Sequence, residues 1–276
     1  MKTLPALRFR FLSVLVVLSV AGLILVLRPS ALADPIPVRH VNGTIHGFLE
    51  LRSAEGQVLA SGDVVQVAHG DQITAHVTFR FKDGSVDEET TVFTQRRSFH
   101  LITDHHVQKG PSFPHPLDMT IDTRSGMVTV HSTGKDGKDE VSTDHMKLPD
   151  DLANGMLSFA VENISSQTTD ARVSMVVATP KPRLVKLAIS PPDDASFSVG
   201  GEAHKANHYE IKIELGGVAG VVAPLIGKAP QDLQMWTVGG EAPVMVREQG
   251  QLFADGPTWT IELASPVWAD AARAGN

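Results

Sequence analysis

The sequence predicts a mainly β protein, a curled antiparallel sheet or open half-barrel with one or two short helices. Three observations support this fold class. Apolar and polar residues alternate with a period of two in several segments, and short turn motifs separate these segments. Helical spacing of apolar residues is clear in one mid-chain segment. A sandwich and a closed barrel share the first two signals.

The clearest strand is Ile73–Phe81, where alternate residues would share one face of a sheet. Its apolar face would carry Ile73, Ala75, Val77, Phe79 and Phe81. The polar residues between them would face water, so one face of the sheet is buried and the other wet. Lys82–Ser85 supplies a hairpin turn, and Glu89–Gln95 forms the returning strand.

A proline and two acidic residues, Pro149 to Asp151, are typical of the start of a helix. Leu152, Met156 and Phe159 follow at helical spacing, so we expect a short helix over about residues 150–162. After it, alternation predicts further strands over residues 171–178, 183–189, 209–215, 234–238, 244–247 and 258–263.

The N-terminus predicts a secretory signal peptide, residues 1–33, followed by a single β-rich domain, residues 34–276. Basic residues precede the uncharged run Phe11–Leu27, and Ala31-Leu32-Ala33 matches a cleavage pattern that ends after Ala33. The run just reaches the length of a membrane span, so an uncleaved anchor is the alternative. We expect a periplasmic or secreted protein, and the absence of cysteine fits a bacterial periplasm.

The charge balance of the mature chain argues against two classes of partner. Four of the 24 Lys and Arg lie in the leader, which leaves 20 against 31 Asp and Glu, a net charge of −11. Such a chain is not expected to bind nucleic acid, or anionic headgroups by charge alone.

The uncharged, glycine-rich segment Leu215–Gly227 ends in Gly-Lys but is not a phosphate-binding loop. Val222 stands where the motif needs its first glycine, and Ala229 where it needs Ser or Thr. The segment is also too short to span a membrane. Two interpretations remain: a buried plug at one end of the core, or a mobile lid or interfacial segment over an apolar cavity. In the second, Lys228 could meet a carboxylate or a headgroup phosphate.

Histidines and acidic residues do not form a recognisable catalytic or metal motif. We interpret the histidines, including His105, His106 and the pair His204 and His208, as scattered surface residues. Asp87-Glu88-Glu89 is interpreted as a solvated turn. No nucleophile elbow and no cysteine are present, so we predict no enzyme, no metal and no cofactor.

The order of elements resembles the lipoprotein-carrier half-barrel group, LolA/LolB-like proteins and their uncharacterised envelope relatives. The phrases "LPDDLANGM", "KPRLVKL" and "GPTWTIEL" look like signatures of such a secreted family. The resemblance implies a curled sheet that wraps a helix and leaves an apolar concavity for acyl chains. The chain departs from lipid-anchored members because it has no cysteine to acylate.

The predicted function is therefore non-enzymatic binding of an apolar ligand, a hydrophobic small molecule or lipid. Transient membrane contact is an open alternative, and the sequence sets no oligomeric state. The expected binding residues are Phe79, Phe81, Leu152, Met156, Phe159, Val221, Leu225, Ile226 and Lys228. Two other functions stay open. One is a structural or interaction module of the envelope with a filled core, and the other is a metal-dependent hydrolase that uses Asp104–His106.

Overall fold

The computed structural model describes residues 35–133, 138–165, 167–178, 181–199, 202–214, 231–240 and 243–264. The chain divides into two units, 1–32 and 33–276, and every described residue belongs to the second. The predicted signal peptide and the segment Leu215–Gly227 lie outside the described residues. Within the described ranges, no helix has the length and apolar character needed to cross a membrane.

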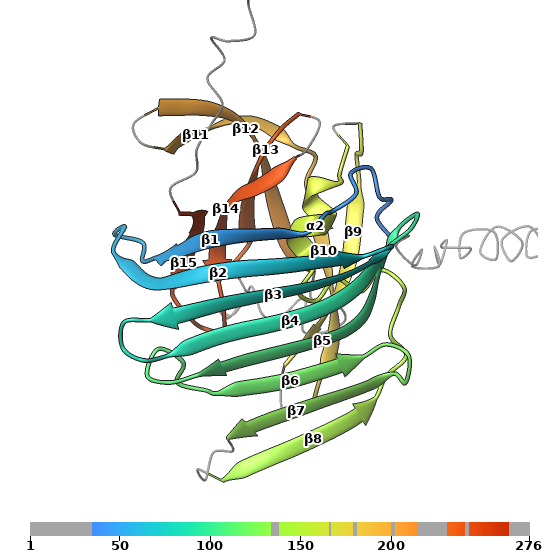
Figure 1. Ribbon diagram of the computed structural model, residues 1–276. Coiled ribbons are helices and arrows are strands. Elements are labelled where there is room, and N and C mark those ends of the chain that lie inside the picture. The colour runs from blue at the N-terminus through green and yellow to red at the C-terminus, as the bar shows by residue number, and fades with distance from the viewer. Residues whose placement is uncertain are drawn as a thin grey trace, which may run out of the picture. The chain divides into compact units, whose positions relative to one another are not determined.

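The described residues confirm the predicted fold class, because they form one antiparallel sheet of 15 strands that curls without closing (Figure 1). The first eight strands are β1 (Ile45–Arg52), β2 (Val58–His69), β3 (Gln72–Phe81), β4 (Val86–Gln95), β5 (Phe99–Lys109), β6 (Leu117–Asp122), β7 (Met127–Thr133) and β8 (Asp139–His145). The other elements are α2 (Leu157–Glu162), β9 (Ala171–Val177), β10 (Arg183–Ile189), β11 (Asp193–Val199), β12 (Glu202–Glu214), β13 (Leu233–Val238), β14 (Val244–Gln251) and β15 (Thr258–Leu263).

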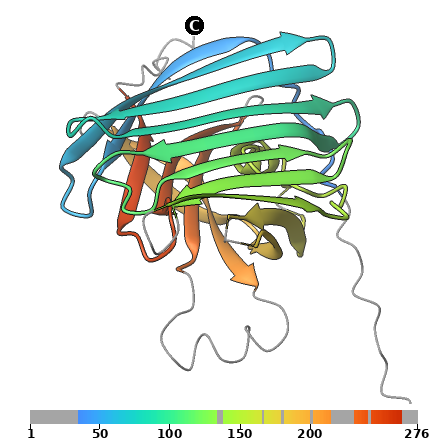
Figure 2. The ribbon, with the colours of Figure 1, turned by 90° about the horizontal axis from the view of Figure 1, so that it is seen from below.

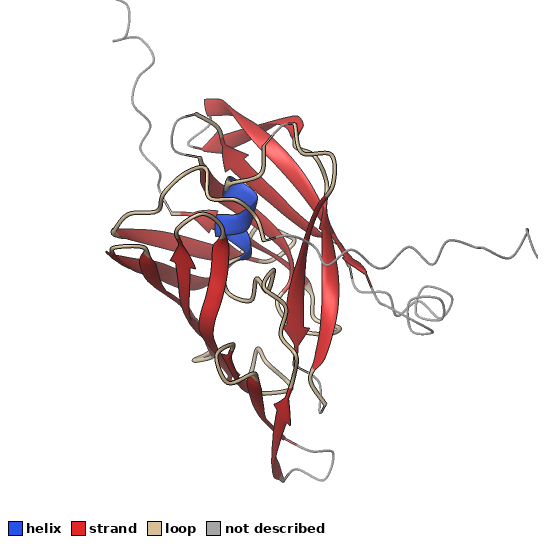
Figure 3. Cartoon of the chain, turned by 90° about the vertical axis from the view of Figure 1, so that its right-hand side faces the viewer, coloured by secondary structure: helices blue, strands red, loops and turns tan. Residues whose placement is uncertain are grey.

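The sheet consists of two runs of strands joined at β1. Strands β1 to β8 pair with their neighbours in chain order, as a meander. On its other edge β1 pairs with β15, and the second run continues through β14, β13, β12 and β10 to β9. Strand β11 pairs with β12 outside this path. The two runs face each other with α2 between them (Figures 2 and 3).

The interior between the runs holds two large apolar clusters. One surrounds α2 and includes Phe93, Phe99, Leu187 and Ile211, all almost fully buried. The other is aromatic and consists of residues of β1, β2, β3 and β15 together with Phe113. The predicted apolar face of Ile73–Phe81 points into this interior, which confirms that strand. Burial of apolar surface at about 25 cal/mol per Å² is the main force that keeps the two runs together.

The predicted helix over residues 150–162 is wrong in its first half, since α2 begins only at Leu157. Residues 151–153 instead lie along β9, the last strand of the sheet, where the amide of Ser174 donates to the carbonyl of Asp151 and the amide of Ala153 to that of Ser174. This pairing satisfies backbone groups that an open edge would leave without partners. Asp151 is buried and accepts a 2.8 Å bond from Lys186 Nζ, so it does not cap a helix.

Gly155 adopts a φ of +63° and lets the loop before α2 approach β4 and β5 closely. A Cβ at this position would overlap Thr91 Oγ1 and come within 2.5 Å of Asp104 Oδ1. No other residue type fits both the backbone conformation and the space.

We therefore expect Gly155→Ala to lower the free energy of unfolding by about 3 kcal/mol, from left-handed strain plus overpacking. Gly84→Ala is the matched control, because Gly84 has a φ of +88° with nothing within 4 Å of its added Cβ. It should cost only about 1 kcal/mol. Urea denaturation measures both, and equal costs would show that the contact with Thr91 and Asp104 is not tight.

Candidate functional site

The residues predicted to bind an apolar ligand do not form one surface. Phe79 and Phe81 belong to the aromatic cluster, where the Phe81 ring lies 5.3 Å from Phe113 and 5.4 Å from Trp259. Leu152 and Met156 are almost fully buried in the cluster around α2. Phe159 is half-buried, and its ring centroid lies 4.9 Å from that of Phe93. These side chains pack against protein. Val221, Leu225, Ile226 and Lys228 lie outside the described residues.

A polar cluster lies on the inner face of β4 and β5, which the sequence analysis did not predict. Asp87, Glu89 and Thr91 of β4 pair in register with Gln108, His106 and Asp104 of β5. Asp87 is 7% exposed and Asp104 0%. The solvated turn predicted for residues 87–89 is wrong, and so is the surface position of His106. The physical reason is that β4 begins at Val86, so alternation directs Asp87 and Glu89 inward.

Hydrogen bonds hold this cluster in a defined arrangement. His106 Nε2 lies 2.8 Å from Asp87 Oδ1, and Gln108 Nε2 donates to Asp87 Oδ2 at 3.1 Å. Thr91 donates to Asp104 Oδ1 at 2.9 Å, while Asp104 Oδ2 is buried without a hydrogen-bond partner among the described residues. A buried carboxyl oxygen without a partner favours the neutral form of Asp104.

The same surroundings shift the ionisation of the cluster. Burial raises the pKa of Asp104 to about 8, and the nearby Glu89 carboxylate adds to this rise. Burial alone would lower the pKa of His106, but the carboxylates of Glu89 and Asp87 outweigh it and raise that pKa to about 9. Across the interior, burial raises the pKa of Glu248 on β14 to about 7. In the described part of the chain, no three His, Asp or Glu side chains are placed to hold a metal ion.

A separate pocket of about 240 Å³ opens on the outer face of the second run. The turn between β1 and β2 borders it on one side, and strands β13, β14 and β15 form its floor. Its lining residues are Arg52, Ser53, Ala54, Gly56, Trp236, Arg247, Gln249, Thr260 and Glu262. The volume lies below the roughly 300–1,000 Å³ typical of drug-sized ligands, so a small ligand or one end of a larger one would fit.

The pocket is built on one row of cross-strand neighbours. In register, His208 of β12 lies beside Trp236, Trp236 beside Arg247, Arg247 beside Glu262, and Glu262 beside Glu50 of β1. Such directly opposed side chains are close enough to interact. The row therefore runs across five strands and links the C-terminal strands to β1.

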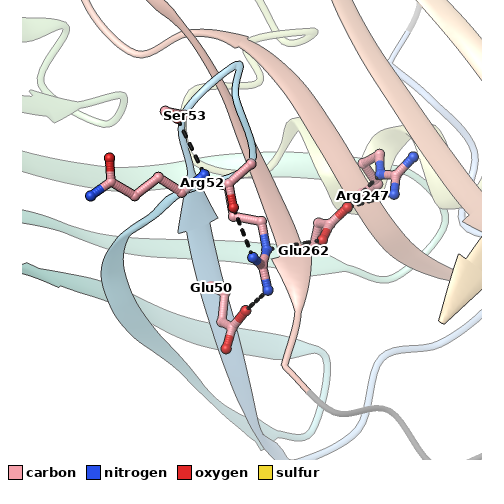
Figure 4. Close-up of polar contacts among 7 residues, drawn as sticks. Glu50, Arg52, Ser53, Arg247 and Glu262 are labelled. Carbon is pink, nitrogen blue, oxygen red and sulfur yellow. Dashed lines mark hydrogen bonds and ion pairs between the residues drawn. The ribbon is translucent and has the colours of Figure 1, made fainter. Parts of the chain in front are cut away.

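Glu262 lies between the two arginines of the pocket (Figure 4). Arg247 Nε donates to Glu262 Oε1 at 2.7 Å, and Nη2 lies 2.6 Å from the same oxygen. Arg52 Nε lies 3.4 Å from Glu262 Oε2 but outside hydrogen-bonding geometry. Arg52 also donates to Glu50 and, at 3.0 Å, to the carbonyl of Gly56. Both guanidinium groups are thus fixed in position.

Aromatic rings hold Arg247 from two sides. Its guanidinium carbon lies 5.1 Å from the Phe197 ring centroid and 5.7 Å from that of Trp236. The ring of His208 lies 4.8 Å from Trp236, and its Nε2 bonds to Gln234 at 2.6 Å. His204 and His208 both lie in strand β12. These contacts restrict Arg247 to one orientation.

No protein family, curated protein or solved structure matches this chain. The pocket therefore has to be interpreted from its own chemistry. Sequence reasoning missed it because its residues come from two distant stretches, 52–56 and 236–262, without a shared motif. Polar residues at alternate positions, Arg247 and Gln249 in β14 and Thr260 and Glu262 in β15, were the sequence signal.

We expect Arg247→Gln to lower the free energy of unfolding by about 2 kcal/mol, because Glu262 loses two charge-assisted contacts and Phe197 loses its cation. Arg172→Gln is the control, since the Arg172 side chain is 43% exposed and pairs with Asp170 at the sheet edge. It should change stability by less than about 0.5 kcal/mol. Thermal and urea denaturation test this, and similar small effects would mean that the arginine row is only a surface network.

Proposed function

We propose that the protein is a non-enzymatic binding protein that holds a small carboxylate-bearing ligand in the outer pocket. The observation that carries this proposal is the pair of rigidly held guanidinium groups, Arg52 and Arg247, in one pocket of about 240 Å³. Planar guanidinium groups match the two oxygens of a carboxylate. The predicted signal peptide would place this pocket outside the cytoplasm.

The hydrogen-bonding capacity of the pocket supports an acceptor-rich ligand. Two guanidinium groups carry about ten N–H donors and no acceptor. Contacts with Glu262, Glu50 and Gly56 occupy about half of these. Gln249, Thr260 and Ser53 add further polar groups at the wall. A ligand with a carboxylate would use the remaining N–H groups except Arg52 Nε, which is buried beside Glu262.

Electrostatics limits the ligand to a single negative charge. The lining carries two arginines and one glutamate, and Glu50, which Arg52 contacts beside the lining, brings the local sum to zero in a mature chain of net charge −11. A multiply charged anion would face both Glu262 and the negative field of the whole protein.

Titration of the mature chain, residues 34–276, with acetate, glucuronate and their amides tests this function by NMR. We expect the carboxylates to shift the Trp236 indole and Arg247 Nε signals, and the amides to bind at least about tenfold more weakly. Arg52→Lys keeps the charge but loses the planar fork, so it should weaken binding about tenfold. Arg172→Lys, outside the pocket, should not change it.

Each outcome of this titration is informative. Carboxylate binding that is lost in Arg52→Lys supports the proposal. If acid and amide bind equally, the pocket takes a polar, uncharged ligand and the carboxylate proposal is wrong. If no compound shifts the two signals at millimolar concentration, the arginine pair has a structural role only.

Binding of an acyl chain stays a second proposal, as the resemblance to lipoprotein carriers implies. The observation that favours it is the open, curled sheet whose inner face carries the large apolar clusters. The packing of Phe79, Phe81, Leu152 and Met156 against protein places it second to the pocket.

Native mass spectrometry of the mature protein from a lipid-containing host tests the acyl-chain proposal. A stoichiometric lipid that copurifies, and is lost in Leu225→Asp, is the expected result. Val141→Asp is the control, because Val141 is 62% exposed on the edge strand β8. An apo mass that persists after addition of fatty acid would exclude the carrier function.

A further inference from the structure

Strand β14 connects the outer pocket with the interior polar cluster. Its residues Arg247 and Gln249 line the pocket. Glu248, between them, points to the opposite face because side chains alternate along a strand. In register, Glu248 lies between Met235 of β13 and Ile261 of β15, both buried in the interior clusters. A shift of β14 that moves Glu248 must therefore also move the pocket.

Glu248 faces the charged groups of the other run. Its carboxyl group interacts electrostatically with Asp87 and Glu89 of β4. Both of these residues, and Asp104 of β5, also interact with His106. The strands next to Glu89 and Glu248 present Val77, Met235 and Ile261, which do not titrate. From α2, Glu162 accepts a 2.7 Å bond from the amide of Met245, also on β14. Of the described groups, His106 acts on Glu89, Asp87 and Asp104, and His105 acts on Asp104 as well.

One hydrogen bond crosses directly between the runs at this level. Gln108 of β5 donates to the carbonyl of Leu252, after β14, at 3.0 Å, and the same Nε2 donates to Asp87. The charge of the His106–Asp87 pair therefore affects Gln108, whose side chain holds the end of β14 in place.

We propose that the cluster of His106, Asp87, Glu89, Asp104 and Glu248 is a pH-sensitive clamp that holds the two strand runs together when protonated. Through β14 it also sets the position of Arg247 in the outer pocket, a step that rests on the proposed ligand function. Loss of protons leaves several carboxylates facing one another across the interior, so the runs separate there and β14 shifts.

The direction of the pH dependence follows from linkage. Burial raises the pKa of Glu248 to about 7 and of Asp104 to about 8, and the carboxylates raise the pKa of His106 to about 9. All three folded values lie above the ordinary ones, so the folded state binds more protons than the unfolded state. The stability that these groups contribute is therefore fully present below their ordinary pKa values, and it is lost as pH rises from there through about 7 for Glu248, about 8 for Asp104 and about 9 for His106.

Urea unfolding of the mature chain from pH 5.5 to 9.5 tests the clamp without any ligand. We expect the folded fraction to fall with rising pH, the unfolding constant growing up to about tenfold per pH unit for each excess proton. Glu248→Gln should lower the number of excess protons that the folded state binds by about one between pH 5 and 7. Asp104→Asn should lower this number by about one up to about pH 8. Glu88→Gln is the control, because Glu88 lies on the opposite face of β4 beside His76.

The link to the pocket has its own readout. Without ligand, the Trp236 indole and Arg247 Nε signals should move with pH over the same window, and Glu248→Gln should remove most of that movement. Acetate is then added as the probe at pH 6 and pH 9. Failure of acetate to bind would count against the proposed function alone. Equal pH dependence of stability in wild type, Glu248→Gln and Asp104→Asn would overturn the clamp.

Discussion

The pairing of the first strand with the last, β1 with β15, is the constraint on which the rest of the structure depends. It joins a meander of eight strands to a second run that follows much later in the chain. The register Leu51 to Ile261 and Glu50 to Glu262 fixes both faces at once. On the inner face it aligns the aromatic cluster, and on the outer face it brings Arg52 to Glu262. Contacts so distant in sequence carry a large loop-closure cost, which the buried interior must offset.

The same register gives β14 two different environments. Its outer side joins the row of His208, Trp236, Arg247 and Glu262, where every charged group has a partner close by. Its inner side places Glu248 opposite acidic residues of β4, with His106 as their shared cation. A slip of one residue in the pairing of β15 would exchange the two faces of that strand. It would bury Glu262, the partner of Arg52 and Arg247, in the apolar clusters. The arrangement of both polar regions therefore follows from one choice of strand register.

Sequence reasoning succeeded where one strand contained the whole signal and failed where pairing decided the outcome. The alternation in Ile73–Phe81 identifies its buried face without knowledge of neighbours. Residues 150–156 have helical spacing, but the edge of β9 competes for their backbone groups and Gly155 breaks the helix. Asp87 and Glu89 look solvated because a polar inner face has no sequence signature. The pocket could not be predicted, since only the β1–β15 pairing brings Arg52 to Glu262.

The interior cluster is costly in a way that an apolar interior would not be. Burial of several carboxyls around His106 opposes their ionisation, and Asp104 Oδ2 has no hydrogen-bond partner among the described residues. Replacement of such groups by apolar residues of similar size is often neutral or stabilising. A cluster of this kind is therefore not explained by stability, and perturbed ionisation in a concave interior is typical of functional sites. Glu248 belongs to this costly cluster and shares strand β14 with Arg247 and Gln249, which line the pocket. The cluster is therefore placed to act on the pocket.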